Sequence, residues 1–372
     1  MKHLVMKRNF QNIIYITLLC IATIACKKEN GPDAKDNFLN YEIPEVPVTD
    51  NYVVGAFYQD VPAFNANVTQ VPILGKYNML NGIVPPDIMT KHLQYAATGG
   101  LDYFLFSFRS AARDVSGFRR DSAIVSAYLS AATPTSVRFA LAYNFSNDVF
   151  GISPNALLEN DPVKLEQFFN DVEKVAAWMT DAKYMTVNNK KLLYIMNAHN
   201  LFSANNPAIY NTLRSRLSTK GVELYIVGMQ DRWSPPGRYP FRFQHCVDAI
   251  FHQPFLPDGY DRFYLLPQIM DQNWKYSTKY FAEQMGVDYV PNIFPAYDWR
   301  IQNPSNQNPT VDRKDNGTLY KKLCNVAKMN ASKSTRLILI SAFNDWNNDA
   351  QLEPAQSYGD LYLNITKTQF KR

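Results

Sequence analysis

The chain has 372 residues, of which 46% are hydrophobic and 19% are charged, and its formal net charge is +5. No block of Lys or Arg accompanies this small excess, so the charge gives no case for nucleic acid as a partner. We also expect no metal site, because no zinc-ligand spacing relates His92, His199, His245, His252, Cys246 and Cys324.

The first residues have the features of an export signal. Lys2, Lys7 and Arg8 give a positive start, and no acidic residue precedes Glu29. The run over 13–25 is almost wholly apolar, but it is shorter than the roughly 20 apolar residues that a membrane-spanning helix needs. It fits the apolar core of a signal peptide.

Cys26 follows directly where this apolar run stops. A Cys in this place is the usual acceptor of a bacterial lipid anchor. We therefore predict a signal peptide over 1–25 and lipid attachment at Cys26, which would anchor the exported protein at the cell envelope. The outer membrane of a gram-negative bacterium is the expected place. The alternatives are an uncleaved membrane anchor and an ordinary cleaved signal.

Residues 26–50 are rich in Pro, Asp, Asn and Glu and lack periodicity, which predicts a flexible tether. Removal of the signal takes three basic residues away and leaves 35 basic residues against 33 acidic ones. We expect residues 51–372 to form a single domain. Its Cys246 and Cys324 could form one disulfide, although two Cys in a large chain are more often buried small hydrophobic residues.

Eight apolar, β-rich runs recur along the domain. Continuous apolar runs of this kind suit strands that are buried on both faces, as in a parallel sheet. In chain order they are Tyr52–Tyr58, Tyr103–Phe108, Arg138–Tyr143, Leu192–Met196, Leu224–Gly228, Ala249–His252, Tyr289–Phe294 and Leu337–Ser341.

Segments of helical character separate these runs. Helices are predicted over Pro86–Ala97, Asp161–Met179 and Asn206–Leu217, from Pro or Asp-Pro at the start and Gly at the end of two of them. Strands that alternate with helices form parallel βαβ units. Eight units predict an α/β fold with a single (β/α)8 TIM barrel. A doubly wound open sheet is the alternative, weakened by the lack of a Gly-rich phosphate turn after the first strand.

In such barrels the chemistry lies at the C-terminal ends of the strands. These ends combine Tyr and Trp, whose faces can stack on sugar rings, with Asp, Asn, Gln and Arg, which can pair with hydroxyls. The composition therefore indicates a carbohydrate site. The segments are Tyr58-Gln59-Asp60, Arg109, Tyr143-Asn144, Asn197 with His199, Gln230-Asp231-Arg232-Trp233, His252-Gln253, Tyr297-Asp298-Trp299-Arg300 and Asn344-Asp345-Trp346.

The last strand end carries the most specific motif. Residues 341–355 read SAFNDWNNDAQLEPA and are followed by SYGDLYL at 357–363. This resembles the C-terminal motif of glycoside hydrolase family 99 and its WbsX-like relatives, roughly NEWxEGxQxEP, then YG and a closing helix. Weaker similarity covers 72–77, 184–194 and 295–300, so the resemblance spans the domain.

The resemblance implies a retaining hydrolase that acts within α-mannose-containing glycans and needs no metal or cofactor. In this family two Glu residues three apart carry the reaction. The first is the base toward the 2-hydroxyl of the sugar, which attacks the anomeric carbon. The second is the general acid on the leaving oxygen and then the base toward water. Glycoside cleavage generally uses two carboxyl groups in this way.

The chain departs from the family motif at both positions. Asp345 stands at the first Glu and shortens its reach by one methylene, while Asn348 stands at the second and cannot act as a carboxylic acid. Asp349 occupies the position of the next Gly. Asp349 could supply the acid after a shift of the loop. A carboxylate from another strand end, Asp60, Asp231 or Asp298, could do so instead, or the acid is missing and the protein only binds glycans.

Several residues are predicted to bind substrate. Gln351 and Glu353 match the family motif, and Glu353 could instead anchor the loop to the closing helix. Trp346 could be a sugar platform or could pack beneath the site, and Asp298 with Arg300 could be a structural ion pair. The remaining candidates, supported by their positions at strand ends, are Tyr58, Asp231, Trp233 and His252.

Three functions remain open from the sequence. The first is a surface-anchored, endo-acting glycoside hydrolase that cleaves an α-mannoside-like oligo- or polysaccharide with retention. The second is a catalytically silent glycan-binding lipoprotein that works with other glycan-uptake proteins. The third is a role in building surface polysaccharide, which the export signal argues against. No Gly-x-Ser-x-Gly, HExxH or P-loop motif supports other hydrolase, metalloprotease or nucleotide functions.

Overall fold

The fold is described from a computed structural model, which covers residues 39–131, 136–231, 242, 245–253, 265–308 and 310–372. The predicted signal peptide, Cys26 and Trp233 lie outside these residues. The chain divides into two compact units, Met1–Glu42 and Ile43–Arg372, and the second contains the whole predicted domain. No helix in the described part has the length and apolar character to span a membrane.

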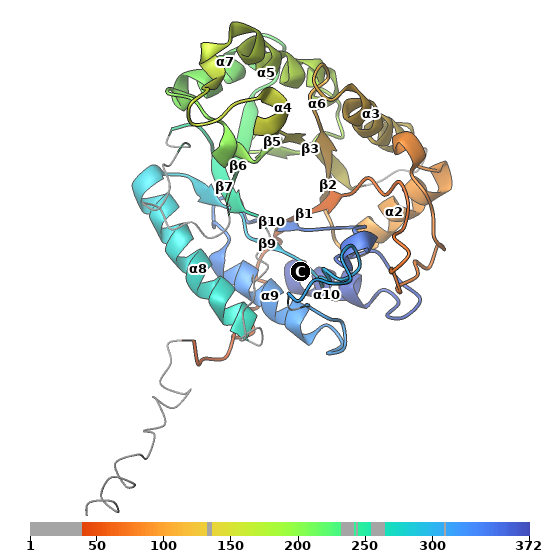
Figure 1. Ribbon diagram of the computed structural model, residues 1–372. Coiled ribbons are helices and arrows are strands. Elements are labelled where there is room, and N and C mark those ends of the chain that lie inside the picture. The colour runs from red at the N-terminus through yellow and green to blue at the C-terminus, as the bar shows by residue number, and fades with distance from the viewer. Residues whose placement is uncertain (1–38, 132–135, 232–241, 243–244, 254–264, 309) are drawn as a thin grey trace, which may run out of the picture. The chain divides into compact units, whose positions relative to one another are not determined.

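All eight predicted strands are present, and they form one curled sheet with parallel neighbours (Figure 1). The sheet order is β8-β7-β6-β5-β3-β2-β1-β10-β9. The strands are β1 Val53–Tyr58, β2 Tyr103–Phe108, β3 Arg138–Asn144, β5 Lys190–Met196, β6 Leu224–Gln230, β7 Ala249–His252, β8 Asp288–Tyr289, β9 Asn292–Ile293 and β10 Leu337–Ile340.

The sheet closes through an interrupted strand. β8 pairs with β7, and β9 pairs with β10 on the other side. Between them, the Val290 amide donates to the Ile250 carbonyl at 2.8 Å, and the Leu339 amide donates to the Pro291 carbonyl at 2.9 Å. Pro291 has no amide hydrogen to donate, which splits the predicted continuous strand in two. The two halves occupy one strand position, so the predicted (β/α)8 barrel is confirmed.

Helices surround the strands (Figure 1). The predicted helix over Asp161–Met179 is two helices, because Val175 leaves the helical region at φ −98° and ψ 3°. The helices are α2 Pro86–Thr98, α3 Val115–Ser130, α4 Asn147–Phe150, α5 Pro162–Lys174, α6 Ala176–Met179, α7 Asn206–Ser218, α8 Leu266–Tyr280, α9 Thr318–Asn330 and α10 Leu361–Phe370. Short helical turns lie at Leu80–Gly82, Leu158–Asn160, Ala198–Asn200, Phe281–Met285 and Trp346–Asn348.

A short hairpin that the sequence analysis did not predict precedes the fourth barrel strand. β4 Thr186–Val187 pairs antiparallel with β5. Asn188 and Asn189 connect them with φ values of 51° and 61°. Two central residues with positive φ are typical of a tight hairpin turn, and Asn adopts this conformation at low cost.

The barrel interior is filled by alternate side chains of the strands, as the twofold periodicity of a strand requires. Tyr103, Tyr194, Val227, Phe251 and Leu339 belong to this buried cluster. The hydroxyls of Tyr103 and Tyr194 are hydrogen-bonded across the interior at 2.8 Å. The intervening side chains point outward and pack under the helices.

The domain begins earlier than predicted. Residues 43–50 do not behave as a free tether, because they lie against α9 and α10. The Val46 amide donates to Oδ1 of Asn325 at 2.8 Å, and the Val46 carbonyl accepts from Nζ of the buried Lys328 at 2.5 Å. Glu45 Oε1 accepts from Gln369 at 2.9 Å. These contacts move the domain boundary from residue 51 to Ile43.

The structure contains no disulfide between Cys246 and Cys324, and both side chains are buried. Burial raises the pKa of the Cys246 thiol to about 12, so it is protonated at neutral pH. Both residues pack as small hydrophobic side chains.

Candidate active site

A pocket of about 510 Å³ lies at the C-terminal ends of the strands. Its floor is formed by inward-facing side chains of the barrel, including Met196, Met229 and Leu339. Loops that follow the strands form its walls. The place agrees with the general position of active sites in (β/α)8 barrels.

The pocket walls combine aromatic rings with amides. The aromatic side chains are Phe57, Phe251, Phe294, Tyr297 and Trp299, and the amides are Gln59, Asn144, Asn197, Gln253, Asn292 and Asn348. Tyr297 and Trp299 pack edge to face, with ring centroids 4.9 Å apart. Nε1 of Trp299 is buried without a hydrogen-bond partner among the described residues, so it is a donor that a ligand could satisfy. Flat apolar faces and amides suit a neutral, hydroxyl-rich ligand.

Asp345 is the one charged side chain among the described residues that line this pocket. It follows β10 and begins the turn Trp346–Asn348. Burial raises the pKa of the Asp345 carboxyl to about 6, against the opposing effect of a hydrogen bond from Asn348. A carboxylate with this pKa is still mostly ionised at pH 7 and is a stronger base than an ordinary Asp.

Asn348 lies beside Asp345 and is held on both sides. Its Nδ2 donates to Oδ2 of Asp345 at 2.8 Å, and its Oδ1 accepts from Nε2 of Gln302 at 2.6 Å. Its carbonyl accepts from the Asp298 amide at 2.8 Å. The residue therefore joins the loop after β10 to the loop after β9. Its amide can donate a hydrogen bond but is too weak an acid to protonate a leaving oxygen.

Asp349 is not among the described residues that line the pocket. Its Oδ1 accepts from Nε of Arg313 at 3.0 Å and from Nε2 of Gln351 at 3.1 Å. Arg313 is itself held between the rings of Tyr358 and Tyr362. These contacts do not support the interpretation that Asp349 replaces the acid. Its φ of 53° explains why the family motif has Gly at this position.

Glu353 is the centre of a buried network beneath the site. Its Oε2 accepts from the Tyr77 hydroxyl at 2.6 Å and from Nε1 of Trp346 at 2.8 Å, and Oε1 lies 3.0 Å from Nε2 of His92. The Tyr58 hydroxyl lies 2.8 Å from Nδ1 of the same His92. Side chains from β1, α2 and the loop after β10 are joined by this one carboxylate.

Four predicted substrate-binding residues therefore need correction. Their exposed fractions are at most 2%, and none of them lines this pocket: Tyr58, Trp346, Gln351 and Glu353. The structure assigns them to packing and to the support of the loop. For Tyr58 the cause is strand alternation, since Phe57 and Gln59 point into the barrel and the residue between them points out.

The alternation of side chains along a strand also shows that the predicted substrate-binding role of His252 is wrong. Its neighbours Phe251 and Gln253 line the pocket, whereas His252 is buried on the outer side with Nδ1 2.7 Å from the Tyr289 hydroxyl. Burial lowers the pKa of His252 to about 4, so it is neutral at pH 7. The helix layer, and not the pocket, receives this side chain.

The other candidates have different surroundings. Asp298 and Arg300 form a local ion pair at 2.8 Å, and hydrogen bonds from Arg300 lower the pKa of Asp298. Trp299 between them lines the pocket. Asp231 is half-buried after β6 and is not among the described lining residues. No group of three or more His, Cys, Asp or Glu in the described ranges could hold a metal ion.

Comparison with known proteins assigns the family. A family model described as "Glycosyltransferase WbsX" matches residues 144–366. The chain belongs to the WbsX family. No curated protein is detectably similar in sequence.

Solved structures relate this WbsX-family chain to glycoside hydrolases. A structure described as a "Glycoside hydrolase-like protein" is 30% identical, with a TM-score of 0.80 over 91% of this chain and 99% of the other. The GH99 endo-alpha-mannosidase from Bacteroides thetaiotaomicron is 19% identical, with a TM-score of 0.61 over 86% of this chain and 96% of the other. The first match shows family and fold, and the second shows the fold. The predicted WbsX-like membership is confirmed, and the predicted likeness to family 99 holds at the level of the fold.

Proposed function

We propose that the protein is a glycoside hydrolase that cleaves α-mannoside-like glycans, endo-acting and with retention, through Asp345. The observation that carries this proposal is the position of Asp345. It is a carboxylate with a pKa of about 6 in a pocket walled by aromatic rings and amides. The family similarity to glycoside hydrolase-like proteins supports the reaction type.

In this proposal Asp345 accepts the proton of a sugar 2-hydroxyl while that oxygen attacks the anomeric carbon and displaces the leaving oxygen. Water then opens the resulting 1,2-anhydro sugar at the anomeric carbon, and Asp345 returns the proton to the 2-oxygen. The leaving oxygen must also gain a proton. Asn348 cannot give one, and no second carboxylate lines the pocket among the described residues. If water supplies this proton, the rate should be lower by about 10²–10⁴ than with a positioned acid. The proposed enzyme is therefore slow.

A catalytically silent glycan-binding protein is the second candidate. The specific observation in its favour is that the Asn348 amide occupies the place of the family acid and hydrogen-bonds to Asp345. This arrangement would hold Asp345 as a binding group for sugar hydroxyls. The pocket then retains its ligand without cleaving it.

Three proteins separate these functions: wild type, Asp345→Asn and Asn348→Glu, with the exposed Asp312→Asn as control. Binding of α-mannan oligosaccharides is measured by calorimetry, and cleavage by the appearance of reducing ends. A hydrolase should cleave slowly, lose at least 100-fold in rate with Asp345→Asn while still binding, and gain rate with Asn348→Glu. A binder should show no cleavage until Asn348→Glu is introduced. Absence of binding in the wild type, or full activity in Asp345→Asn, contradicts the proposal.

We also propose that Cys26 carries a lipid that anchors the protein at the cell envelope, where it meets polymeric glycans with other uptake proteins. The export features of the first 26 residues support this. Labelling cells with an alkyne fatty acid should tag the wild type and not Cys26→Ala. Equal labelling of both proteins would contradict the anchor.

A further inference from the structure

A second pocket, of about 310 Å³, adjoins the first. The two share Phe57, Gln59 and Asn144 in their linings, so they are neighbouring compartments at the same end of the barrel. The second pocket opens between β1, β2 and α3. The loop between β1 and its helix is fixed there, because Asn344 exchanges two hydrogen bonds with the backbone of Gln59, at 2.7 and 3.1 Å.

This second pocket contains polar atoms that the described part of the protein leaves without hydrogen bonds. Oδ1 of Asp60, Oγ of Ser107 and Nε of Arg120 are all buried and lack such a partner. Nε of Arg120 lies 3.3 Å from the other Asp60 oxygen, Oδ2, as an ion pair. Burial raises the pKa of the Asp60 carboxyl, against the opposing charges of Arg120 and Arg109. A donor at Oδ1 would stabilise the ionised form.

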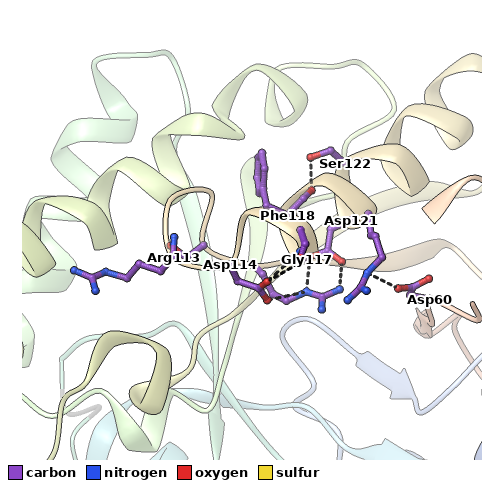
Figure 2. A network of polar contacts seen from close by, with 11 residues as sticks. Asp60, Arg113, Asp114, Gly117, Phe118, Asp121 and Ser122 are labelled. Carbon is purple, nitrogen blue, oxygen red and sulfur yellow. Dashed lines mark hydrogen bonds and ion pairs between the residues drawn. The ribbon is translucent and has the colours of Figure 1, made fainter. Parts of the chain in front are cut away.

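The remaining charges form a rigid frame (Figure 2). Arg109 donates to both oxygens of the buried Asp121, at 2.9 and 2.7 Å. Asp114 caps the start of α3 by accepting from the Gly117 amide at 3.0 Å. Paired groups of this kind keep their positions when a ligand arrives. Asp60 and Arg120 are the charged members that still have hydrogen-bonding capacity.

The equal numbers of positive and negative side chains in the second pocket favour an uncharged ligand. Two arginines, Arg109 and Arg120, face two aspartates, Asp60 and Asp121, so the pocket offers no net attraction to an anion. A sugar hydroxyl can donate to a carboxylate and accept from a guanidinium, which an ionised carboxylate or phosphate cannot do. The apolar side chains of Phe57 and Pro62, which are not fully buried, add surface for the C–H face of a ring.

We propose that this second pocket binds the neighbouring sugar unit of the glycan, as a neutral hexose whose adjacent hydroxyls pair with Asp60 and Arg120. The inference rests on the proposed function, because the first pocket must hold the adjoining unit. In this proposal, Asp60 and Arg120 make the protein prefer a substrate of at least two sugar units, with an uncharged sugar in the second pocket. Gln59 and Asn144 then contact the linkage region between the two units.

The test compares α-mannose, α-mannobiose and a uronic-acid disaccharide by calorimetry. Wild type should bind the neutral disaccharide at least ten-fold more tightly than the monosaccharide. The double variant Asp60→Ala/Arg120→Ala should lose this gain and keep its affinity for the monosaccharide. The control is Arg119→Ala, which removes an exposed arginine from the next position of α3. If the protein cleaves glycans, the double variant should raise KM and leave kcat within a few-fold.

The outcomes are separable. Absence of any glycan binding by the wild type contradicts the proposed function itself. Retention of the disaccharide gain in the double variant contradicts the second subsite while the first pocket stands. Tighter binding of the uronic-acid disaccharide overturns the preference for a neutral unit. A loss confined to kcat would show that Asp60 takes part in proton transfer and would overturn its role in binding.

Discussion

Asp345 combines two properties that work against each other. It faces a pocket that water must leave when a glycan enters, and its burial opposes the ionised form that a base needs. The hydrogen bond from Asn348 compensates in part. A catalytic carboxylate in such a place costs stability, which is a common property of active sites.

This cost gives a prediction for Asp345→Asn. The folded-state pKa is about 6 and lies above the unfolded value, so the charged form destabilises the fold above that pH. The variant should be more stable than wild type at pH 8, by up to about 3 kcal/mol at 1.36 kcal/mol per pKa unit. The difference should shrink as the pH falls through 6 and vanish near 4. Urea unfolding at each pH measures it, and a pH-independent difference would count against the assignment.

Glu353, unlike Asp345, stabilises the fold, because its carboxylate accepts hydrogen bonds from buried donors. Glu353→Leu leaves Tyr77, Trp346 and His92 without their acceptor in a buried place. Such losses typically cost about 3–5 kcal/mol. The midpoint of urea unfolding should fall strongly. The control is Glu166→Leu at the exposed ion pair with Arg216, which should change little. Similar midpoints for the two variants would refute the network's importance.

At the scale of the elements, the strands could be predicted from the sequence because each is a continuous apolar run. The interruption at Pro291 was not predicted, because the sequence analysis treated Tyr289–Phe294 as one strand in spite of its Pro and the Asn that follows it. The hairpin of β4 depends on Asn188 and Asn189, whose positive φ values are a turn feature rather than a hydrophobic pattern.

The sequence analysis located the segments that form the pocket, but within a segment it often chose a side chain that does not line the pocket. The sequence analysis chose Tyr58 and His252, whereas their neighbours Gln59 and Gln253 line the pocket. Strand alternation separates the two, but its phase must be fixed by at least one known inward residue. Asn292 and Ser341 were not chosen at all, because they are small polar residues that belong to apolar runs, Asn292 within one and Ser341 at the end of another. Loop packing, which buries Trp346, has no local sequence signal.

A substitution at Gly55 tests how tightly the side chains inside the barrel are packed. A Cβ at this position would lie 2.1 Å from Cζ of Tyr103, whose hydroxyl is fixed by Tyr194. Gly55→Ala should therefore cost about 1–3 kcal/mol or more through overpacking. Combination with Tyr103→Leu should recover part of the loss, which a double-mutant cycle in urea measures. Additive costs would show that the two residues do not compete for space.

At the scale of the whole domain, the segment that enters the barrel is part of the fold. The backbone of Val46 donates a hydrogen bond to the Asn325 side chain and accepts one from the ammonium of Lys328, both on α9. Burial lowers the pKa of Lys328, so its charged form depends on these acceptors. The folded domain therefore starts at Ile43, eight residues before the predicted boundary.

Shortening the chain tests this boundary. A protein that begins at residue 51 should melt at a lower temperature than one that begins at residue 43. A loss of about 1 kcal/mol corresponds to roughly 2–4 °C in domains of about 150–250 residues and to less in a larger one. Lys328→Met should restore part of the loss in the shorter protein, since it removes the buried ammonium. Scanning calorimetry of the four proteins gives the result. Equal melting temperatures for the two lengths would place the boundary back at residue 51.

The proposed chemistry depends on one carboxylate of raised pKa in a glycan pocket. The most direct measurement is the pH dependence of kcat/KM for an α-mannan oligosaccharide between pH 4 and 9. The proposed role of Asp345 as base predicts that kcat/KM falls about ten-fold per pH unit below pH 6 and that Asp345→Asn is inactive throughout. A profile that stays level down to pH 4, or the absence of cleavage at every pH, would contradict it.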